Sequence, residues 1–196
     1  MKLFNLWETE KIEVHDLGLK DYINIRPLMI PRTGGRNVRT QFWKSKNHIV
    51  ERLMNKLMVS GHKGRKHKIS SGHNSGKSTM VYNAVVDAFK IIEKQTSNNP
   101  VEVFVKALEN AAPREEITTI EYGGAKYPQS VECSPQRRID IALRQMVHGS
   151  YDNSFRSKRK ISETLADEIM KAYNNDNKSQ AIAKKMELER QAEASR

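Results

Sequence analysis

The residues most able to do chemistry in this chain are lysines and arginines gathered in one stretch. The chain has 34 Lys and Arg residues, twelve of which lie in residues 31–77. The same stretch holds one of the 23 Asp and Glu residues, so the rest of the chain has 22 basic and 22 acidic residues. The net charge of +11 therefore comes from this stretch, whose only acidic residue is Glu51. Such a surface attracts a polyanion, because each phosphate that it neutralises releases condensed counterions. The composition predicts nucleic acid as the partner.

An ordinary solvated surface is the alternative explanation for so many basic residues. Solvated helix faces normally carry acidic residues among the basic ones, and here these are missing between Arg32 and Lys77 except for Glu51. The basic side chains would repel one another unless an anion lay among them. We therefore favour nucleic acid over a solvated face.

The segment Gly72–Thr79 is similar to a nucleotide-binding phosphate loop, but it is one residue too short. Such a loop has four residues between its first glycine and Gly-Lys-Ser/Thr, so that backbone amides wrap the phosphates. Three residues lie between Gly72 and Gly76 here, no good β-strand precedes them, and no second acidic strand is visible to hold magnesium. The segment argues against a nucleoside triphosphatase, although a helix that begins after Lys77 suits contact with a phosphate backbone.

Other residues with reactive side chains form no recognisable catalytic or metal-binding pattern. The histidines His62, His67 and His73 fit no zinc spacing, and no cysteine joins them. Cys133 is the only cysteine, and nothing in the sequence marks a base beside it. No Ser/His/acid or paired-carboxylate arrangement stands out. We expect neither an enzyme nor a metal or other cofactor.

Length and composition indicate a small helical protein. A chain of 196 residues with 37% hydrophobic residues should form one domain, with or without extensions, around a lean core. Such a core suits a helical bundle better than a buried parallel sheet. No apolar run approaches the roughly 18 residues of a membrane span, and the N-terminus has no secretory signal pattern. We expect a cytoplasmic protein without a membrane partner.

Apolar residues at helical spacing mark the elements that must position the basic residues. Residues 1–42 lack this spacing and are expected to form an irregular basic N-terminal extension, with a strand-like piece near Tyr22–Ile25. Helices are expected over about 42–59, 78–92, 101–111, from Pro135, over 161–173 and in 178–196. The Ser78 and Thr79 hydroxyls are expected to cap the second helix. The predicted fold class is mainly α, a helical bundle of about six helices with a protruding β-hairpin and the irregular N-terminal extension.

The hairpin is predicted from two β-branched and aromatic runs, Ile117–Tyr122 and Tyr127–Cys133, on either side of Gly123–Lys126. Two strands alone are marginal in water, and Pro128 and the tip glycines weaken them further. The hairpin therefore either packs on the helices as an ordinary element or docks into a partner. A lysine and two tyrosines near its tip offer charge and stacking faces for the second possibility.

The order of these elements resembles the universal small-subunit ribosomal protein S-seven family, in its archaeal and eukaryotic form. The similarity covers nearly the whole chain from about Trp7. The matching stretches are Ile49–Asn55, Ala107–Asn110 with Pro113–Glu115, Val131–Arg138, Leu165–Glu168 and Lys184–Arg190.

The resemblance implies a structural constituent of the small ribosomal subunit. It implies a protein that binds the 3′ major domain of small-subunit rRNA, nucleates assembly of the subunit head, and lies near the mRNA exit channel and the exit-site tRNA. Its other partners would be neighbouring head and platform proteins, including the S-eleven family. We expect an N-terminal extension in residues 1–42 and an rRNA-binding helical domain in residues 43–196, with the hairpin at about 115–133.

The resemblance also assigns roles to individual residues. The implied rRNA-binding residues are Arg32, Arg36, Arg39, Lys44, Lys46, Arg65, Lys66, Lys77, Arg114, Arg137 and Arg138. The hairpin residues implied to lie near mRNA and tRNA are Gly123, Gly124, Lys126 and Tyr127. The loop Gly61–Ser75 is longer than the family pattern.

A DNA-binding helical regulator is the remaining rival. It would need a recognition helix rich in Asn, Gln and Arg on one exposed face, and usually a dimer seam. No predicted helix shows both, so the basic stretch and the resemblance agree on a structural RNA-binding protein.

Overall fold

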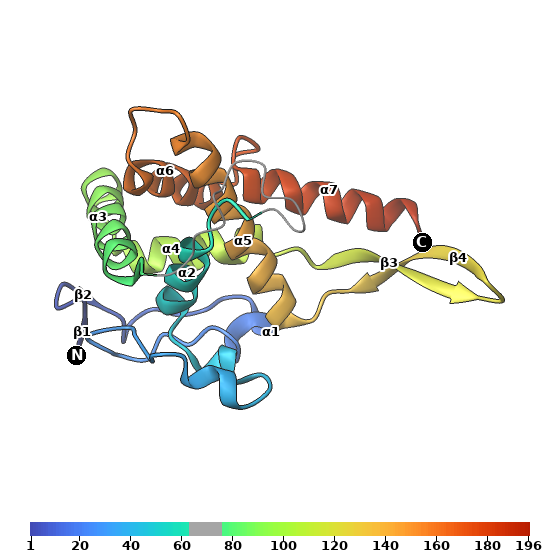
Figure 1. Ribbon diagram of the computed structural model, residues 1–196, viewed down its shortest axis with the longest axis horizontal. Helices are drawn as coiled ribbons and strands as arrows, with labels where there is room; N and C mark the ends of the chain where they lie inside the picture. The colour runs from blue at the N-terminus through green and yellow to red at the C-terminus, as the bar shows by residue number, and fades with distance from the viewer. Residues whose placement is uncertain (63–75) are drawn as a thin grey trace.

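The described part of the chain, residues 1–62 and 76–196 of the computed structural model, contains seven α-helices and two antiparallel strand pairs (Figure 1). The mainly α prediction is therefore confirmed. Two 3₁₀ turns, Arg36–Arg39 and Trp43–Lys46, precede the second helix. The helices are α1 (Leu17–Lys20), α2 (Ile49–Met58), α3 (Ser78–Thr96), α4 (Pro100–Ala111), α5 (Pro135–Ser154), α6 (Ile161–Tyr173) and α7 (Gln180–Ala194). The strands are β1 (Lys2–Leu3), β2 (Trp7–Glu8), β3 (Glu115–Tyr122) and β4 (Ala125–Glu132).

Helix α5 is central to the bundle and contacts α1, α2, α4, α6 and α7. Its apolar stripe of Ile139, Leu143 and Met146 is completely buried, as the helical spacing of these residues predicts. On the other side of the core, Phe89 of α3 packs on Phe104 of α4, with ring centroids 5.9 Å apart. In the described part of the chain, every helix is too short or too polar to span a membrane.

Two predicted helix starts need correction. The helix expected from Phe42 begins at Ile49, because Phe42 has a left-handed backbone (φ 65°) and the following residues form a 3₁₀ turn. The N-cap of α3 is Lys77 rather than a hydroxyl residue. Ser78 is the first residue of the helix, and its Oγ accepts a hydrogen bond from Arg32 at 3.0 Å.

The N-terminal segment packs into the same core as the helices. Leu3 and Leu19 are completely buried, and the ring of Phe4 lies edge-on to Trp7 and to Phe89 of α3. In place of the strand expected near Tyr22–Ile25, there is a single parallel bridge from Asn24 to His48. The apolar residues of this segment follow no regular period, because they meet the core from turns, two-residue strands and the single turn of α1.

The hairpin is confirmed and protrudes from the bundle (Figure 1). Its turn is Gly123-Gly124, and positive φ angles of 59° and 81° at these glycines match the tight turn that suits twisted strands. The base of β3 lies against α7, whereas residues 118–129 are all exposed. The hairpin therefore leans on the helices at its base and leaves its outer half free for a partner.

Helix α7 buries Ala181, Ile182 and Ala192, and it begins beside a buried carboxylate. Glu168 of α6 accepts hydrogen bonds at Oε1 from Ser179 Oγ (2.7 Å) and from the Ala181 amide (3.2 Å). A Cβ at Gly149 of α5 would lie 3.0 Å from Glu168 Cδ, so this glycine permits the close approach. Burial raises the pKa of Glu168 above its ordinary value of 4.5, although these hydrogen bonds oppose the shift.

The buried Glu168 should give the protein a pH-dependent stability that glutamine lacks. Because its folded pKa is raised, its stabilising contribution is complete below the unfolded value of 4.5 and is lost as the pH rises through the folded pKa. We expect the free energy of unfolding of Glu168→Gln, relative to the parent, to increase from pH 4 to pH 8 in urea titrations. A difference that does not change with pH would contradict this assignment.

Candidate nucleic-acid interface

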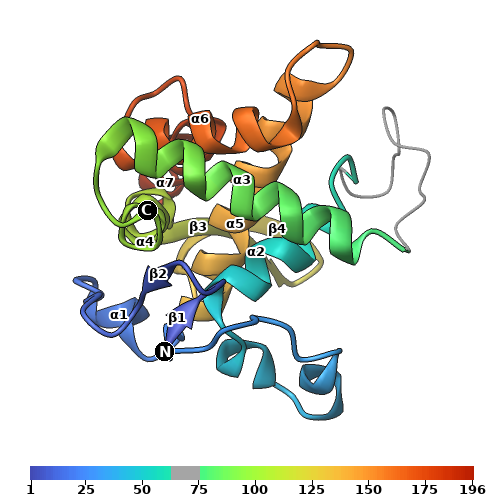
Figure 2. The ribbon, with the colours of Figure 1, turned by 90° about the vertical axis from the view of Figure 1, so that its left-hand side faces the viewer.

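The two 3₁₀ turns carry four of the eleven basic residues that are predicted to bind rRNA. Arg36 and Arg39 are exposed on the first turn. On the second, Lys46 is exposed, with Nζ 4.8 Å from the centroid of the Trp43 ring, and Lys44 is half-buried. In Figure 2 these turns lie at the lower right, on the side where α3 begins. The predicted cationic residues of this region are therefore brought together on one side of the molecule.

Apolar side chains are exposed among these cations. Val38 and Phe42 are 82% and 68% exposed, and Trp43 is partly exposed beside them in sequence. Exposed rings next to basic side chains offer stacking faces to unpaired bases. The sequence predicts stacking residues at the hairpin tip, and the adjacent Phe42 and Trp43 inside the basic stretch are a second signal of the same kind.

A cavity of about 260 Å³ between α2 and α5 gathers further positive charge. Its charged lining residues are Lys44, Arg52, Lys56, Arg144 and Asp140. Asp140 pairs with Lys44 and, at 3.3 Å, with Arg52. Burial alone would raise the pKa of Asp140, but the hydrogen bond from Lys44 and the nearby positive charges hold it below its ordinary value.

Four cations share this cavity with one carboxylate, so positive charge remains unbalanced. The pKa of Lys56 is lowered, first by burial and then, against the attraction of Asp140, by repulsion from Arg144, Lys44 and Arg52. A bound anion would balance the excess positive charge and raise the pKa of Lys56. A phosphate group would fit the volume of the cavity. The cavity is not evident from the sequence, because α2 and α5 are distant in the chain.

The remaining predicted residues of the N-terminal half are placed differently. Lys77 is half-buried at the N-terminus of α3, and Arg32 is exposed beside it through its bond to Ser78. Arg65 and Lys66 lie outside the described residues, as do His67, His73 and most of the loop Gly61–Ser75. Within the described ranges, no group of three His, Cys, Asp or Glu side chains could hold a metal ion.

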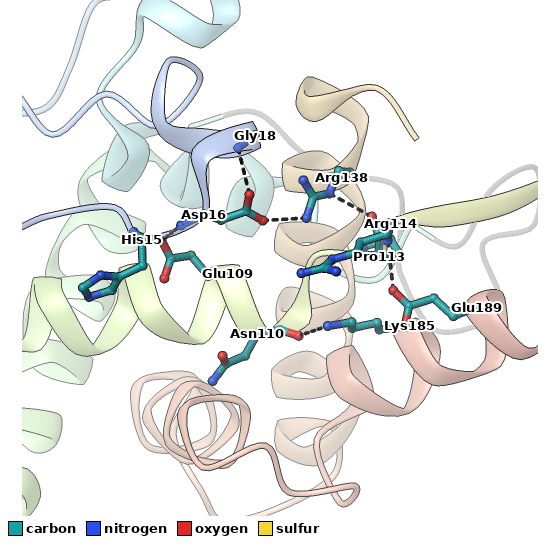
Figure 3. Close-up of polar contacts among 10 residues, drawn as sticks. All are labelled: His15, Asp16, Gly18, Glu109, Asn110, Pro113, Arg114, Arg138, Lys185 and Glu189. Atoms are coloured by element: carbon teal, nitrogen blue, oxygen red, sulfur yellow. Dashed lines mark hydrogen bonds and ion pairs between the residues drawn. The ribbon is translucent and has the colours of Figure 1, made fainter. Parts of the chain in front are cut away.

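Arg138, one of the residues predicted to bind rRNA, is largely buried and forms hydrogen bonds within the protein. Its residue is 8% exposed. Its Nε donates to the Pro113 carbonyl at 3.0 Å, and its Nη2 lies 2.7 Å from Asp16 Oδ2 (Figure 3). A Cβ at Gly18 would lie 3.2 Å from the Arg138 Nη1, so a small residue there suits the close packing. Nε and Nη2 of Arg138 thus join α5 to the residue that precedes the hairpin and to the N-terminal segment.

Further bonds hold the entry to the hairpin from two sides. Glu109 of α4 accepts from the amides of His15 (2.7 Å) and Asp16 (3.1 Å), as Figure 3 shows. From α7, Lys185 Nζ donates to the Asn110 carbonyl at 2.8 Å. Together with Arg138, these residues clamp the chain where α4 ends and β3 is about to begin.

The other two predicted arginines near the hairpin base are exposed. The backbone amide of Arg114 donates to Glu189 Oε1 at 3.0 Å, and Arg114 is exposed. Arg137 forms a two-pronged ion pair with Glu116 of β3, with Nη2 to Oε2 at 2.6 Å, and keeps 56% of its side chain exposed. These two side chains therefore remain at the surface where an RNA could reach them.

A second basic cluster was missed by sequence analysis. It lies in the connection from α5 to α6, where all residues from 155 to 160 are exposed. Figure 2 shows this connection on the same side of the view as the start of α3. Residues outside 31–77 have no net charge in total, but four of the five residues 156–160 are basic, which is the signal that marks this cluster in the sequence. Its members are Arg156, Lys158, Arg159 and Lys160.

Comparison with known proteins gives a consistent family. The ribosomal protein S7p/S5e family matches residues 29–196. A small ribosomal subunit protein uS7 from Nanoarchaeum equitans is 54% identical over 100% of this chain and 99% of its own length. The proteins of that name from Methanothrix thermoacetophila and Archaeoglobus fulgidus are each 44% identical, over 100% and 99% of this chain and 100% and 94% of theirs. These are names of ribosomal proteins and not of enzymes. The chain belongs to the ribosomal protein S7p/S5e family.

Proposed function

We propose that this ribosomal protein of the small subunit works by binding the 3′ major domain of small-subunit rRNA and nucleating assembly of the subunit head. The observation that carries the proposal is the cavity between α2 and α5, where four cations surround one carboxylate. Phosphates of a folded RNA would supply the missing negative charge. The protein would then lie on the ribosome in the cytoplasm.

The exposed 3₁₀ turns extend this interface beyond the cavity. Arg36, Arg39 and Lys46 would neutralise neighbouring phosphates, and Phe42 would stack on an unpaired base. The basic connection from α5 to α6 would continue the same contact. A rigid helical surface with dispersed cations recognises the shape of a folded RNA rather than a short base sequence.

The hairpin would serve a different partner from the helical surface. Its exposed outer half, with Lys126 and Tyr127 near the Gly123-Gly124 turn, would reach toward the mRNA exit channel and the exit-site tRNA. The S-eleven family protein would be a neighbour. The clamp at the hairpin base supports this proposal, because it fixes the direction in which the tip points.

Substitutions at the tip should therefore separate assembly from translation. With Tyr122, Lys126 and Tyr127 replaced by serine, we expect affinity for the rRNA domain to stay within about twofold, because the phosphate-binding residues lie elsewhere. Subunits reconstituted with this variant should show altered tRNA retention at the exit site. Loss of rRNA binding in the variant would make the tip an anchor instead.

The proposed function is tested by binding of the full-length protein to a transcript of the 3′ major domain across a salt series. An equally long structured RNA of unrelated sequence is the control. For six to ten phosphate contacts, affinity should fall by about 10³ to 10⁵ between 50 and 200 mM salt. We expect preference for the rRNA domain to persist at the high end, and equal affinity for both RNAs would refute the proposal.

A further inference from the structure

A second cavity lies on another side of α2 and has a different chemistry. It holds about 410 Å³ and is bounded by residues 30–35, α2 and the first turns of α3. Much of its lining is apolar, from Ile30, Met54, Met58 and Tyr82. A mostly apolar cavity with a few polar groups is typical of a binding site for a small organic molecule or group.

One carboxylate oxygen in this lining receives no hydrogen bond from the described residues. Glu51, 4% exposed, accepts at Oε1 from the Thr33 amide (2.8 Å) and the Thr33 hydroxyl (2.6 Å). Its Oε2 is buried, and no residue in the described ranges donates to it. A buried carboxylate oxygen without a donor is unfavourable, so an N–H group that reached it would be strongly bound.

The aromatic wall of the cavity is held in place. The ring of Tyr82 lies edge-on to Phe4, with centroids 4.9 Å apart and an interplanar angle of 85°. The thioethers of Met54 and Met58 provide adaptable apolar surface in the same lining. The lining therefore offers a planar base one aromatic ring and adaptable apolar surface.

The position of the cavity indicates which molecule supplies the ring. Asn55 lines both this cavity and the cationic one between α2 and α5. Arg32, which also lines it, is exposed and donates to Ser78 Oγ at 3.0 Å. An RNA whose phosphates lie on the basic surface would therefore have this opening beside it.

We propose that the cavity binds one unpaired guanine of the RNA, stacked on Tyr82, with its N–H groups donated to Glu51. Guanine presents two adjacent donors, N1–H and the exocyclic amine, to a carboxylate. Adenine and cytosine place a ring acceptor beside their single amine, and uracil flanks its N–H with two carbonyls, so each brings an acceptor against the carboxylate. This inference rests on the proposed function only in that RNA is the ligand.

The test uses full-length protein carrying ¹³C-methyl methionine, titrated with the pentanucleotides UUGUU, UUAUU, UUCUU and UUUUU. The methyl signals of Met54 and Met58 report on the cavity, and completely buried Met146 serves as the reference. We expect UUGUU to shift Met54 and Met58 at about tenfold lower concentration than the other three. Glu51→Gln replaces one acceptor oxygen by a donor and should reduce this preference to less than about twofold.

Equal titration of the two methyl signals by all four pentanucleotides, or no response from them, would overturn the guanine site. The rRNA and control transcripts test the proposed function separately, since their salt-dependent binding relies on the basic residues. Tyr82→Leu is a second variant, which should weaken UUGUU binding about tenfold by removing the stacking face. The comparison among pentanucleotides on the parent protein stands even if Glu51→Gln fails to fold.

Discussion

An Arg138→Ala protein is expected to lose about 2 to 3 kcal/mol of unfolding free energy, because Asp16 and the Pro113 carbonyl lose their shared donor. The value lies below that of a fully buried pair, since the Asp16 side chain is 24% exposed. For a chain of this length the melting temperature should fall by about 5 to 10 °C. Thermal unfolding by circular dichroism measures the change.

Arg137→Ala is the matched control, because it removes the neighbouring arginine whose side chain is 56% exposed. Its ion pair with Glu116 should contribute less than about 1 kcal/mol. Equal destabilisation by the two substitutions would contradict the structural role of Arg138.

The Arg138 effect should also depend on pH in a defined direction. Burial by itself raises the pKa of Asp16, but the hydrogen bond and charge of Arg138 outweigh it and lower the pKa below 3.8. Because the folded pKa of Asp16 is lowered, its carboxylate stabilises the protein fully above the ordinary value of 3.8. This stabilisation is lost as the pH falls through the folded pKa. The difference in unfolding free energy between the parent and Arg138→Ala should therefore become smaller below about pH 4.

The helices and the hairpin could be predicted because each has a local sequence pattern that specifies its structure. In α6 the apolar residues Leu165 and Ile169 recur at helical spacing and are completely buried. The Gly-Gly pair between two β-branched runs similarly specifies its turn, since both positions need positive φ.

The N-terminal segment could not be predicted in this way. Phe4 reaches the core from a turn and Trp7 from a two-residue strand, and their contacts with α3 join residues more than eighty positions apart in the chain. The second 3₁₀ turn likewise replaces the first part of a predicted helix, because the backbone at Phe42 is left-handed, a conformation that the residue type does not indicate.

Within the site, sequence could identify the cationic region but not the task of each cation. Arg137 and Arg138 are adjacent and identical in type, yet one side chain is largely exposed and the other is buried on Asp16. The helical phase of α5 decides between them, together with the shape of its neighbours. The cavity lining is similarly invisible in sequence, because Lys56 and Asp140 come from different helices.

Replacing Lys44, Lys56 and Arg144 together with glutamine is expected to weaken binding of the 3′ major domain on the order of 100-fold at low salt. Each side chain lines the cationic cavity, and each lost phosphate contact should cost about 1 kcal/mol. The slope of log affinity against log salt should become shallower by about 2, since roughly 0.7 to 0.9 is contributed by each contact. Filter binding across the salt series measures both quantities.

The matched control removes three charges at a distance, with Lys90, Lys94 and Lys178 changed to glutamine. All three are exposed, and the C-terminal half of α3 lies away from the 3₁₀ turns in Figure 2. Both triple variants have the same net charge, so long-range attraction to RNA is nearly equal in the two, and salt screens what difference remains. A loss confined to the cavity variant would therefore reflect phosphates held between α2 and α5, whereas equal losses would mean that total charge, rather than this cavity, governs binding.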